Sequence, residues 1–234
     1  MIRRNGWMMV SIYLGIVVLF FAMTYLGSTV TTMLAQKIPL ERMNRIIIDP
    51  GHGGEDGGAI SCTGIAESQY NLDIALRLND LFQLLGYDTT MIRTTDRSVY
   101  ISGDTIAAKK VSDLRQRAKI VNETEKGILV SIHQNTFQDG RYSGAQVFYG
   151  SKGESRDLAE LVQRSIIDTI NLGSNRQIKK ADGIYLMEHI DRTGILVECG
   201  FLSNPEEEAK LRDPAYQKKL CVVICAATAG FLTK

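Results

Sequence analysis

The fold is decided by residues 45–58, which read Arg-Ile-Ile-Ile-Asp-Pro-Gly-His-Gly-Gly-Glu-Asp-Gly-Gly. The first five residues form a nearly continuous β-branched run, which is typical of a strand buried on both faces of a parallel sheet. Pro50 then ends the strand in a glycine-rich loop. Gly51, Gly53 and Gly54 let the backbone turn sharply and leave space around His52. The alternative, a phosphate-binding loop, is disfavoured because neither of the usual glycine patterns is present and no lysine follows.

Strands and helices alternate after this loop. Apolar residues recur at helical spacing from Glu67 to Leu85, and Gly86 is a plausible helix stop. Further strands are expected at 87–93, 127–133, 144–149 and 194–198, and further helices at 114–121 (capped by Ser112 or Asp113), at 158–170, and after the Asn204-Pro205 and Asp213-Pro214 caps as far as Leu232. This alternation predicts a single α/β domain over residues 45–234, with a mostly parallel sheet flanked by helices.

The N-terminal segment differs in character from the rest. Residues 5–36 contain no Asp, Glu, Lys, Arg or His, and the apolar stretch 7–26 is about 20 residues long, enough to cross a bilayer as a helix. Arg3 and Arg4 precede it, so the positive-inside rule places the N-terminus in the cytoplasm and the domain outside. We interpret 1–36 as an uncleaved signal-anchor helix and 37–44 as a linker. A cleaved signal peptide is the alternative, and it also exports the protein.

The composition argues against two classes of function, nucleic-acid binding and zinc binding by cysteines. Among 234 residues, 44% are hydrophobic and 23% are charged, which is ordinary for a globular protein, and the net charge is +1. No basic block is present that would favour nucleic-acid binding. The four cysteines, which we interpret as small buried hydrophobes, lack the spacing of zinc-binding pairs. They are Cys62, Cys199, Cys221 and Cys225.

Groups with acid–base or metal-binding chemistry follow three of the expected strands. His52 comes just after the first strand, His133 ends the strand 127–133, and Glu198 ends the strand 194–198. Because ligands bind at the carboxyl ends of parallel strands, these groups should converge on one crevice. Glu67, at the start of the following helix, can close the cluster. His189 lies in a polar stretch, and we interpret it as a loop or rim residue.

Two histidines and a carboxylate are a common ligand set in zinc hydrolases, where water takes the fourth position. Glu198 is flanked by apolar residues, so it is either paired with a backbone N–H or an arginine, or it works as a general base beside the metal and its water. Asn135 is the neighbour most suited to bind substrate or to orient His133; a simple turn role is the alternative.

Four segments resemble one family, the zinc-dependent N-acetylmuramoyl-L-alanine amidases. They are Ile48-Asp-Pro-Gly-His-Gly-Gly54, Gly64-Ile-Ala-Glu67 with Asn71-Leu72, Ser131-Ile-His-Gln-Asn135, and Leu196-Val-Glu-Cys-Gly-Phe-Leu-Ser-Asn-Pro205. The resemblance implies that His52, Glu67 and His133 bind Zn²⁺ and that Glu198 is catalytic. The implied reaction is hydrolysis of the amide between N-acetylmuramic acid and L-alanine in peptidoglycan.

The chain is most similar to the spore-cortex members of that family, which take part in forming muramic lactam. A zinc peptidase or deacetylase of the cell wall and an inactive wall-binding module are the alternatives. The loop from 53 to 66 contains five glycines, and ordering each backbone residue costs about 1–2 kcal/mol. We therefore also expect an activating partner protein that orders the ligands.

Overall fold

The computed structural model describes residues 45–233; the expected N-terminal anchor, 1–36, and the linker, 37–44, lie outside the described residues. The helices are α2 (Glu67–Leu84), α3 (Ile106–Glu123), α4 (Ser155–Thr169), α5 (Tyr185–His189), α6 (Pro205–Arg212) and α7 (Pro214–Leu232). The strands are β1 (Arg45–Pro50), β2 (Thr89–Met91), β3 (Gly127–Asn135), β4 (Gln146–Tyr149), β5 (Lys179–Lys180) and β6 (Thr193–Phe201).

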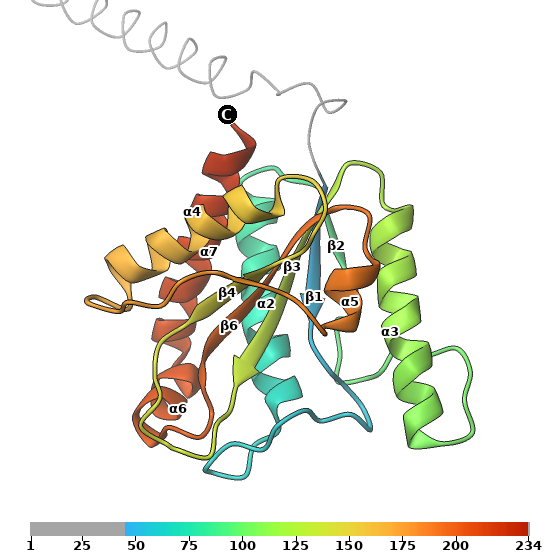
Figure 1. Cartoon of the computed structure of the whole chain (residues 1–234), viewed down its shortest axis with the longest axis horizontal. Helices are drawn as coiled ribbons and strands as arrows, with labels where there is room; N and C mark the ends of the chain where they lie inside the picture. Colours follow the sequence, from blue (N-terminus) through green and yellow to red (C-terminus); the bar gives the residue numbers. More distant parts are fainter. Residues whose placement is uncertain (1–44, 234) are drawn as a thin grey trace, which may run out of the picture. The chain divides into compact units, whose positions relative to one another are not determined.

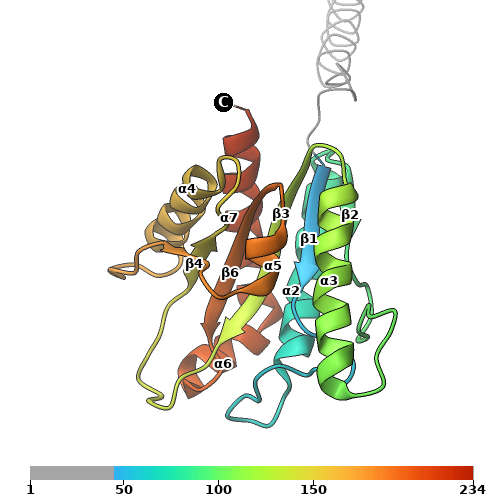
Figure 2. The ribbon, with the colours of Figure 1, turned by 45° about the vertical axis from the view of Figure 1, so that its right-hand side comes forward.

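The strands form one six-stranded sheet in the order β2-β1-β3-β6-β4-β5. Every pairing is parallel except that of β4 with β6, which is antiparallel. The predicted α/β domain with a mostly parallel sheet is therefore confirmed. Figures 1 and 2 show the sheet between two layers of helices, with α3 and α5 on one side and α2, α4 and α7 on the other.

Successive side chains of a strand point to opposite faces of the sheet, so the apolar core is divided between the two helix layers. Ile46 and Ile48 pack with the cluster that contains α2, α4 and α7, whereas Ile47 packs with the cluster that contains α3 and α5. The β-branched run of β1 is thus apolar on both faces because both faces are covered. Central strands held in this way place their carboxyl ends firmly, which matters for the residues that follow them.

The C-terminal helix α7 is part of this core. It is the one described helix that is long and apolar enough to cross a membrane. Its buried residues Leu220, Cys221 and Ile224 belong to the core cluster shared with α2 and α4. Its apolar composition is therefore accounted for by packing inside the domain.

Helix α3 begins earlier than the sequence predicts. Thr105 caps it by accepting a hydrogen bond from the Ala108 N–H at 3.1 Å. The expected caps face elsewhere: the Ser112 hydroxyl accepts the Ile101 N–H at 3.1 Å, and Asp113 accepts the Val99 N–H at 2.6 Å. Both side chains hold the preceding loop, so the predicted start at residue 114 was wrong.

Smaller elements and one cysteine also differ from expectation. The short strand β5 and the short helix α5 have too few residues to give a periodic pattern, and His189 ends α5 in an exposed position. Cys199, Cys221 and Cys225 are buried as predicted, but Cys62 is exposed. Cys62 lies in a turn outside the packed elements, so the prediction for it was wrong.

Candidate active site

The carboxyl ends of three adjacent strands bring the candidate residues together. β3 lies between β1 and β6, and Pro50 pairs with Ile132 while His133 pairs with Glu198. His52 follows β1 by two residues. Glu67 is the first residue of α2, where its backbone N–H donates to the Ala59 carbonyl at 2.8 Å. The structure thus brings His52, His133 and Glu198 to one edge of the sheet, and Glu67 lies beside them.

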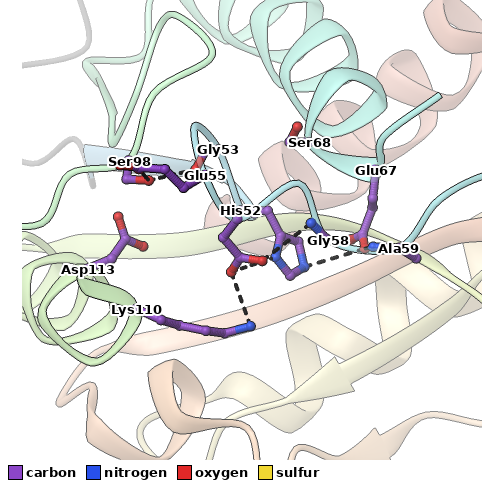
Figure 3. Close-up of polar contacts among 12 residues, drawn as sticks. His52, Gly53, Glu55, Gly58, Ala59, Glu67, Ser68, Ser98, Lys110 and Asp113 are labelled. Carbon is purple, nitrogen blue, oxygen red and sulfur yellow. Dashed lines mark hydrogen bonds and ion pairs between the residues drawn. The ribbon is translucent and has the colours of Figure 1, made fainter. Parts of the chain in front are cut away.

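Glu67 is the centre of a His-Glu-His cluster. Its Oε1 lies 2.9 Å from His133 Nδ1, and its Oε2 lies 3.4 Å from His52 Nε2. One potential ligand atom from each of the three residues lies within 4.8 Å of the others. Figure 3 shows Glu67 reaching from the start of α2 toward His52. Three ligand atoms this close can share one metal ion.

The electrostatics of the cluster favour a cation. Burial acts to raise the pKa of Glu67, but the hydrogen bond to His133 and the charges of both histidines outweigh it and hold the pKa at about 2. Burial acts to lower the pKa of His133, but the bond to Glu67 and the charges of Glu198, Glu67 and Asp49 raise it overall. The raised pKa of His133 shows that the surrounding carboxylates favour a positive charge at this point.

Glu198 lies beside the cluster with one oxygen uncommitted. Oε2 is buried, and no residue within 45–233 gives it a hydrogen bond. Burial raises the pKa of Glu198 to about 7, since the raising effect of Glu67 adds to it and the lowering effect of His133 is smaller. The structural alternative considered for Glu198, a carboxylate bonded to a backbone N–H or an arginine, is therefore not seen for this oxygen.

Two buried arginines, which no sequence pattern marks, hold the loop that carries His52. Arg117 donates to the Pro50 carbonyl at 2.9 Å and the His52 carbonyl at 2.7 Å. Arg93 donates to the Pro50 and Gly51 carbonyls, each at 2.9 Å. Asn71 also donates to Gly51, at 3.2 Å, and to Glu67, at 3.1 Å. The glycine-rich loop is therefore better supported than its composition predicts.

His52 has a backbone φ of 59°, which is unusual for a residue with a side chain. The arginine bonds keep the loop in this conformation. Gly51 is required for a steric reason: a Cβ there would lie 2.1 Å from His133 Nε2. Gly58 has the same role beside Glu67 Oε2, at 2.6 Å. Gly53 and Gly54, in contrast, face the segment 93–98 and not the cluster, contrary to expectation.

A pocket of about 360 Å³ opens onto the cluster. His52, His133 and Glu198 line it, together with Lys110 and Leu114 on α3 and Ile184, Tyr185 and Leu186 at α5. Larger hollows of about 740 and 880 Å³ contain none of the four candidate residues. The chemistry, and not the size of a hollow, identifies the site.

Asn135 ends β3 outside the set of residues that line this pocket. Its backbone carbonyl accepts the Leu202 N–H at 2.8 Å. The bond to His133 that was considered for Asn135 is made instead by Glu67. A role for Asn135 in substrate binding stays a prediction.

A His-Glu-His cluster beside a second acid, at the carboxyl edge of a mostly parallel sheet, is typical of hydrolases that use a bound metal ion. Residues 46–229 match the model of the Amidase_3 family, described as N-acetylmuramoyl-L-alanine amidase. The chain belongs to this family, whose reaction is hydrolysis of the amide bond between N-acetylmuramic acid and L-alanine in peptidoglycan. The sequence-based resemblance to these amidases is therefore confirmed.

Individual relatives support the assignment over nearly the whole chain. A germination-specific N-acetylmuramoyl-L-alanine amidase of Bacillus subtilis is 34% identical over 99% of this chain and 97% of its own length. The amidase CwlD of Clostridioides difficile, solved in complex with the GerS lipoprotein, is 34% identical, with a TM-score of 0.78 over 81% of this chain and 98% of that one. An N-acetylmuramoyl-L-alanine amidase of Clostridium difficile 630 is 31% identical, with a TM-score of 0.71 over 82% of this chain and 98% of that one.

Proposed function

We propose that the amidase reaction of this chain depends on Zn²⁺ held by His52, Glu67 and His133, with Glu198 as the acid–base group. The observation that carries the proposal is the juxtaposition of the three ligand atoms, within 4.8 Å of one another, with the uncommitted Oε2 of Glu198. Two histidines and one glutamate form a ligand set that zinc hydrolases use. Bound zinc would supply a Lewis acid and lower the pKa of a coordinated water.

Glu198 would move the proton in this reaction. Its buried Oε2 has no competing donor within the described chain, so it can accept a proton from water as the water oxygen bonds to the lactyl carbonyl carbon. When the carbon–nitrogen bond breaks, the same carboxyl group can return the proton to the amine of L-alanine. The products are a free lactyl carboxylate and a peptide with a free amino terminus.

His133 and His52 differ in how the chain holds them. Glu67 Oε1 contacts both His133 Nδ1, at 2.9 Å, and the Gln134 backbone N–H, at 3.1 Å. Glu67 therefore ties α2 to the end of β3. His52 is fixed through its backbone by Arg117. The two histidines are brought together by a shared carboxylate on one side and by a restrained loop on the other.

We further propose that the enzyme acts on spore-cortex peptidoglycan and contributes to muramic lactam formation. This rests on similarity to the germination-specific amidase of Bacillus subtilis over nearly the full length of both chains. The expected N-terminal helix, with its apolar stretch 7–26, would anchor the enzyme at the outer face of the cytoplasmic membrane or in the spore intermembrane space. A partner protein is proposed because CwlD of Clostridioides difficile was solved with the GerS lipoprotein.

The decisive experiment is mass spectrometry of purified peptidoglycan incubated with the zinc-loaded protein. New L-alanine amino termini, lost on treatment with a chelator and restored by zinc, are the expected result. Cleaved cross-peptides or released acetate would instead reveal a peptidase or a deacetylase. No product from the zinc-loaded protein would favour the inactive wall-binding module.

A further inference from the structure

Two adjacent acid–lysine pairs join the glycine-rich loop to α3. Glu55 Oε1 lies 2.9 Å from Lys109 Nζ, and Asp56 Oδ2 lies 3.1 Å from Lys110 Nζ. The second pair continues toward the active site, because Asp56 Oδ2 also lies 3.1 Å from His52 Nδ1. Figure 3 shows Lys110 extending from α3 toward the loop that carries His52. Asp56 therefore lies between a lysine and a candidate zinc ligand.

The two ring nitrogens of His52 have different surroundings. Nε2 faces Glu67 Oε2 at 3.4 Å, within the His-Glu-His cluster. Nδ1 is buried, and Asp56 lies within hydrogen-bond distance of it but out of line for a straight hydrogen bond. A neutral imidazole carries its proton on one nitrogen only, and the other nitrogen must be free of a proton to bind a metal. An acceptor at Nδ1 would therefore leave Nε2 available to the cluster.

Asp56 is itself held in place by the backbone of the loop. Its Oδ1 accepts the Gly58 N–H at 3.3 Å, and its carbonyl accepts the Gly53 N–H at 2.8 Å. The second bond closes a tight turn that brings Asp56 back beside His52, four residues earlier. Since Lys110 contacts the same carboxylate oxygen as His52, the carboxylate is fixed from the loop and from α3 together.

We propose that Asp56 is a positioning residue of the amidase, whose carboxylate accepts a hydrogen bond from His52 Nδ1–H and so presents Nε2 to zinc, while Lys110 anchors the carboxylate. This inference rests on the zinc site of the proposed function. Carboxylates that orient a metal-binding histidine typically raise metal affinity or activity by about 10–100-fold. Glu55 and Lys109 form the matched comparison, because they tie the same loop to the same helix without contacting His52.

The test measures the zinc dissociation constant of the full-length protein by chelator competition. We expect Asp56→Ala to weaken zinc binding by about 10–100-fold. Asp56→Asn should lose less, because its amide oxygen can still accept a hydrogen bond but lacks the charge. Glu55→Ala and Glu55→Gln should bind zinc as the wild type does. In zinc-loaded wild type, the ¹⁵N shifts of His52 should show a protonated Nδ1, and Asp56→Ala should alter them.

The outcomes separate this inference from the proposed function. Wild-type protein that binds no zinc would overturn both together. Zinc-binding wild type with unchanged affinity in Asp56→Ala would overturn the inference alone. An equal loss in Glu55→Ala would also overturn it, since the effect would then come from tethering the loop. If Asp56→Ala fails to fold, the Asp56→Asn variant provides the test. Zinc affinity and His52 ¹⁵N shifts equal to those of the wild type in that variant would contradict the inference.

Discussion

His133 of β3 and Glu198 of β6 are direct partners in the parallel register of two central strands. Neighbouring strands lie about 4.8 Å apart, so residues paired in this way project side by side from the same face of the sheet. The register therefore places the proposed base next to a proposed zinc ligand without help from a flexible loop. A site built on strand ends in this manner is held as firmly as the core below it.

Replacing the proposed base should separate chemistry from metal binding. In Glu198→Gln, size and polarity are kept but the side chain cannot take a proton. We expect normal zinc content and activity reduced by roughly 10²–10⁴-fold, measured by the release of L-alanine amino termini. Glu206→Gln, an exposed change nearby in sequence, is the control. Loss of zinc in Glu198→Gln would instead make Glu198 a ligand.

The space left by Gly51 should be essential for metal binding. A Cβ at this position would lie 2.1 Å from His133 Nε2, so Gly51→Ala must displace the ring. We expect zinc affinity to fall by more than about 10-fold, as when a ligand is misplaced. In the same loop, Gly57→Ala adds a Cβ at 3.4 Å from the Ala66 Cβ, and it should bind zinc normally. Equal zinc affinity in the two variants would contradict the geometry.

Acid should weaken the metal-free protein through Asp49. Burial raises the pKa of Asp49, but Arg117, His133 and the hydrogen bond from Ser131 lower it by more, so the folded pKa lies below the unfolded value near 4. The stability from this carboxylate is therefore present above about pH 4 and is lost as pH falls through the folded pKa. Urea unfolding from pH 7 to pH 3 measures this loss.

Asp49→Asn isolates that contribution. At pH 7 the variant should be less stable by about 1.5–3 kcal/mol, because Arg117 keeps Asp113 but loses its charged bond to Asp49. The difference from wild type should shrink as pH falls from about 4 through the folded pKa, because the unfolded chain takes up the proton first and the folded carboxylate only at lower pH. A difference that is the same at pH 7 and pH 3 would show that Asp49 acts through packing and not through its charge.

Zinc occupancy of the protein purified alone should be incomplete at limiting free zinc. Zinc binding requires the segment 53–66, which carries five glycines, to be ordered, and this costs conformational entropy. Only three protein ligands compensate for that cost. The arginine bonds offset part of this cost, but the carbonyls they hold lie on either side of the segment, at residues 50–52 and at Ser68. A partner that packs on the loop would raise affinity by fixing the ligands beforehand. Stoichiometric zinc and full activity of the protein alone would contradict this expectation.

Membrane topology offers an independent test of the N-terminal segment. Arg3 and Arg4 before the apolar stretch 7–26 predict that the domain lies outside the cytoplasmic membrane. Protease added outside intact cytoplasmic membranes should digest the domain, whereas a cytoplasmic marker should survive. Protection of the domain would contradict export and leave the enzyme on the wrong side of the membrane for its substrate.

Local patterns in the sequence determined the main elements. The β-branched run 45–49 predicted β1, and the Asn204 and Asp213 caps correctly marked the starts of α6 and α7. These elements could be predicted because helix caps and buried strands depend on residues within a few positions of one another. The order of strands and loops also indicated that His52, His133 and Glu198 would meet at one edge.

Only the tertiary structure decided how that edge is built. Arg93 and Arg117 lie more than 40 residues from the carbonyls of residues 50–52 that they hold, and nothing local marks them as part of the site. Ser112 and Asp113 have the composition of helix caps, yet packing turned them toward the preceding loop. Strand register, buried hydrogen bonds and the pairing of Asp56 with His52 arise from contacts distant in sequence, which a local pattern does not encode.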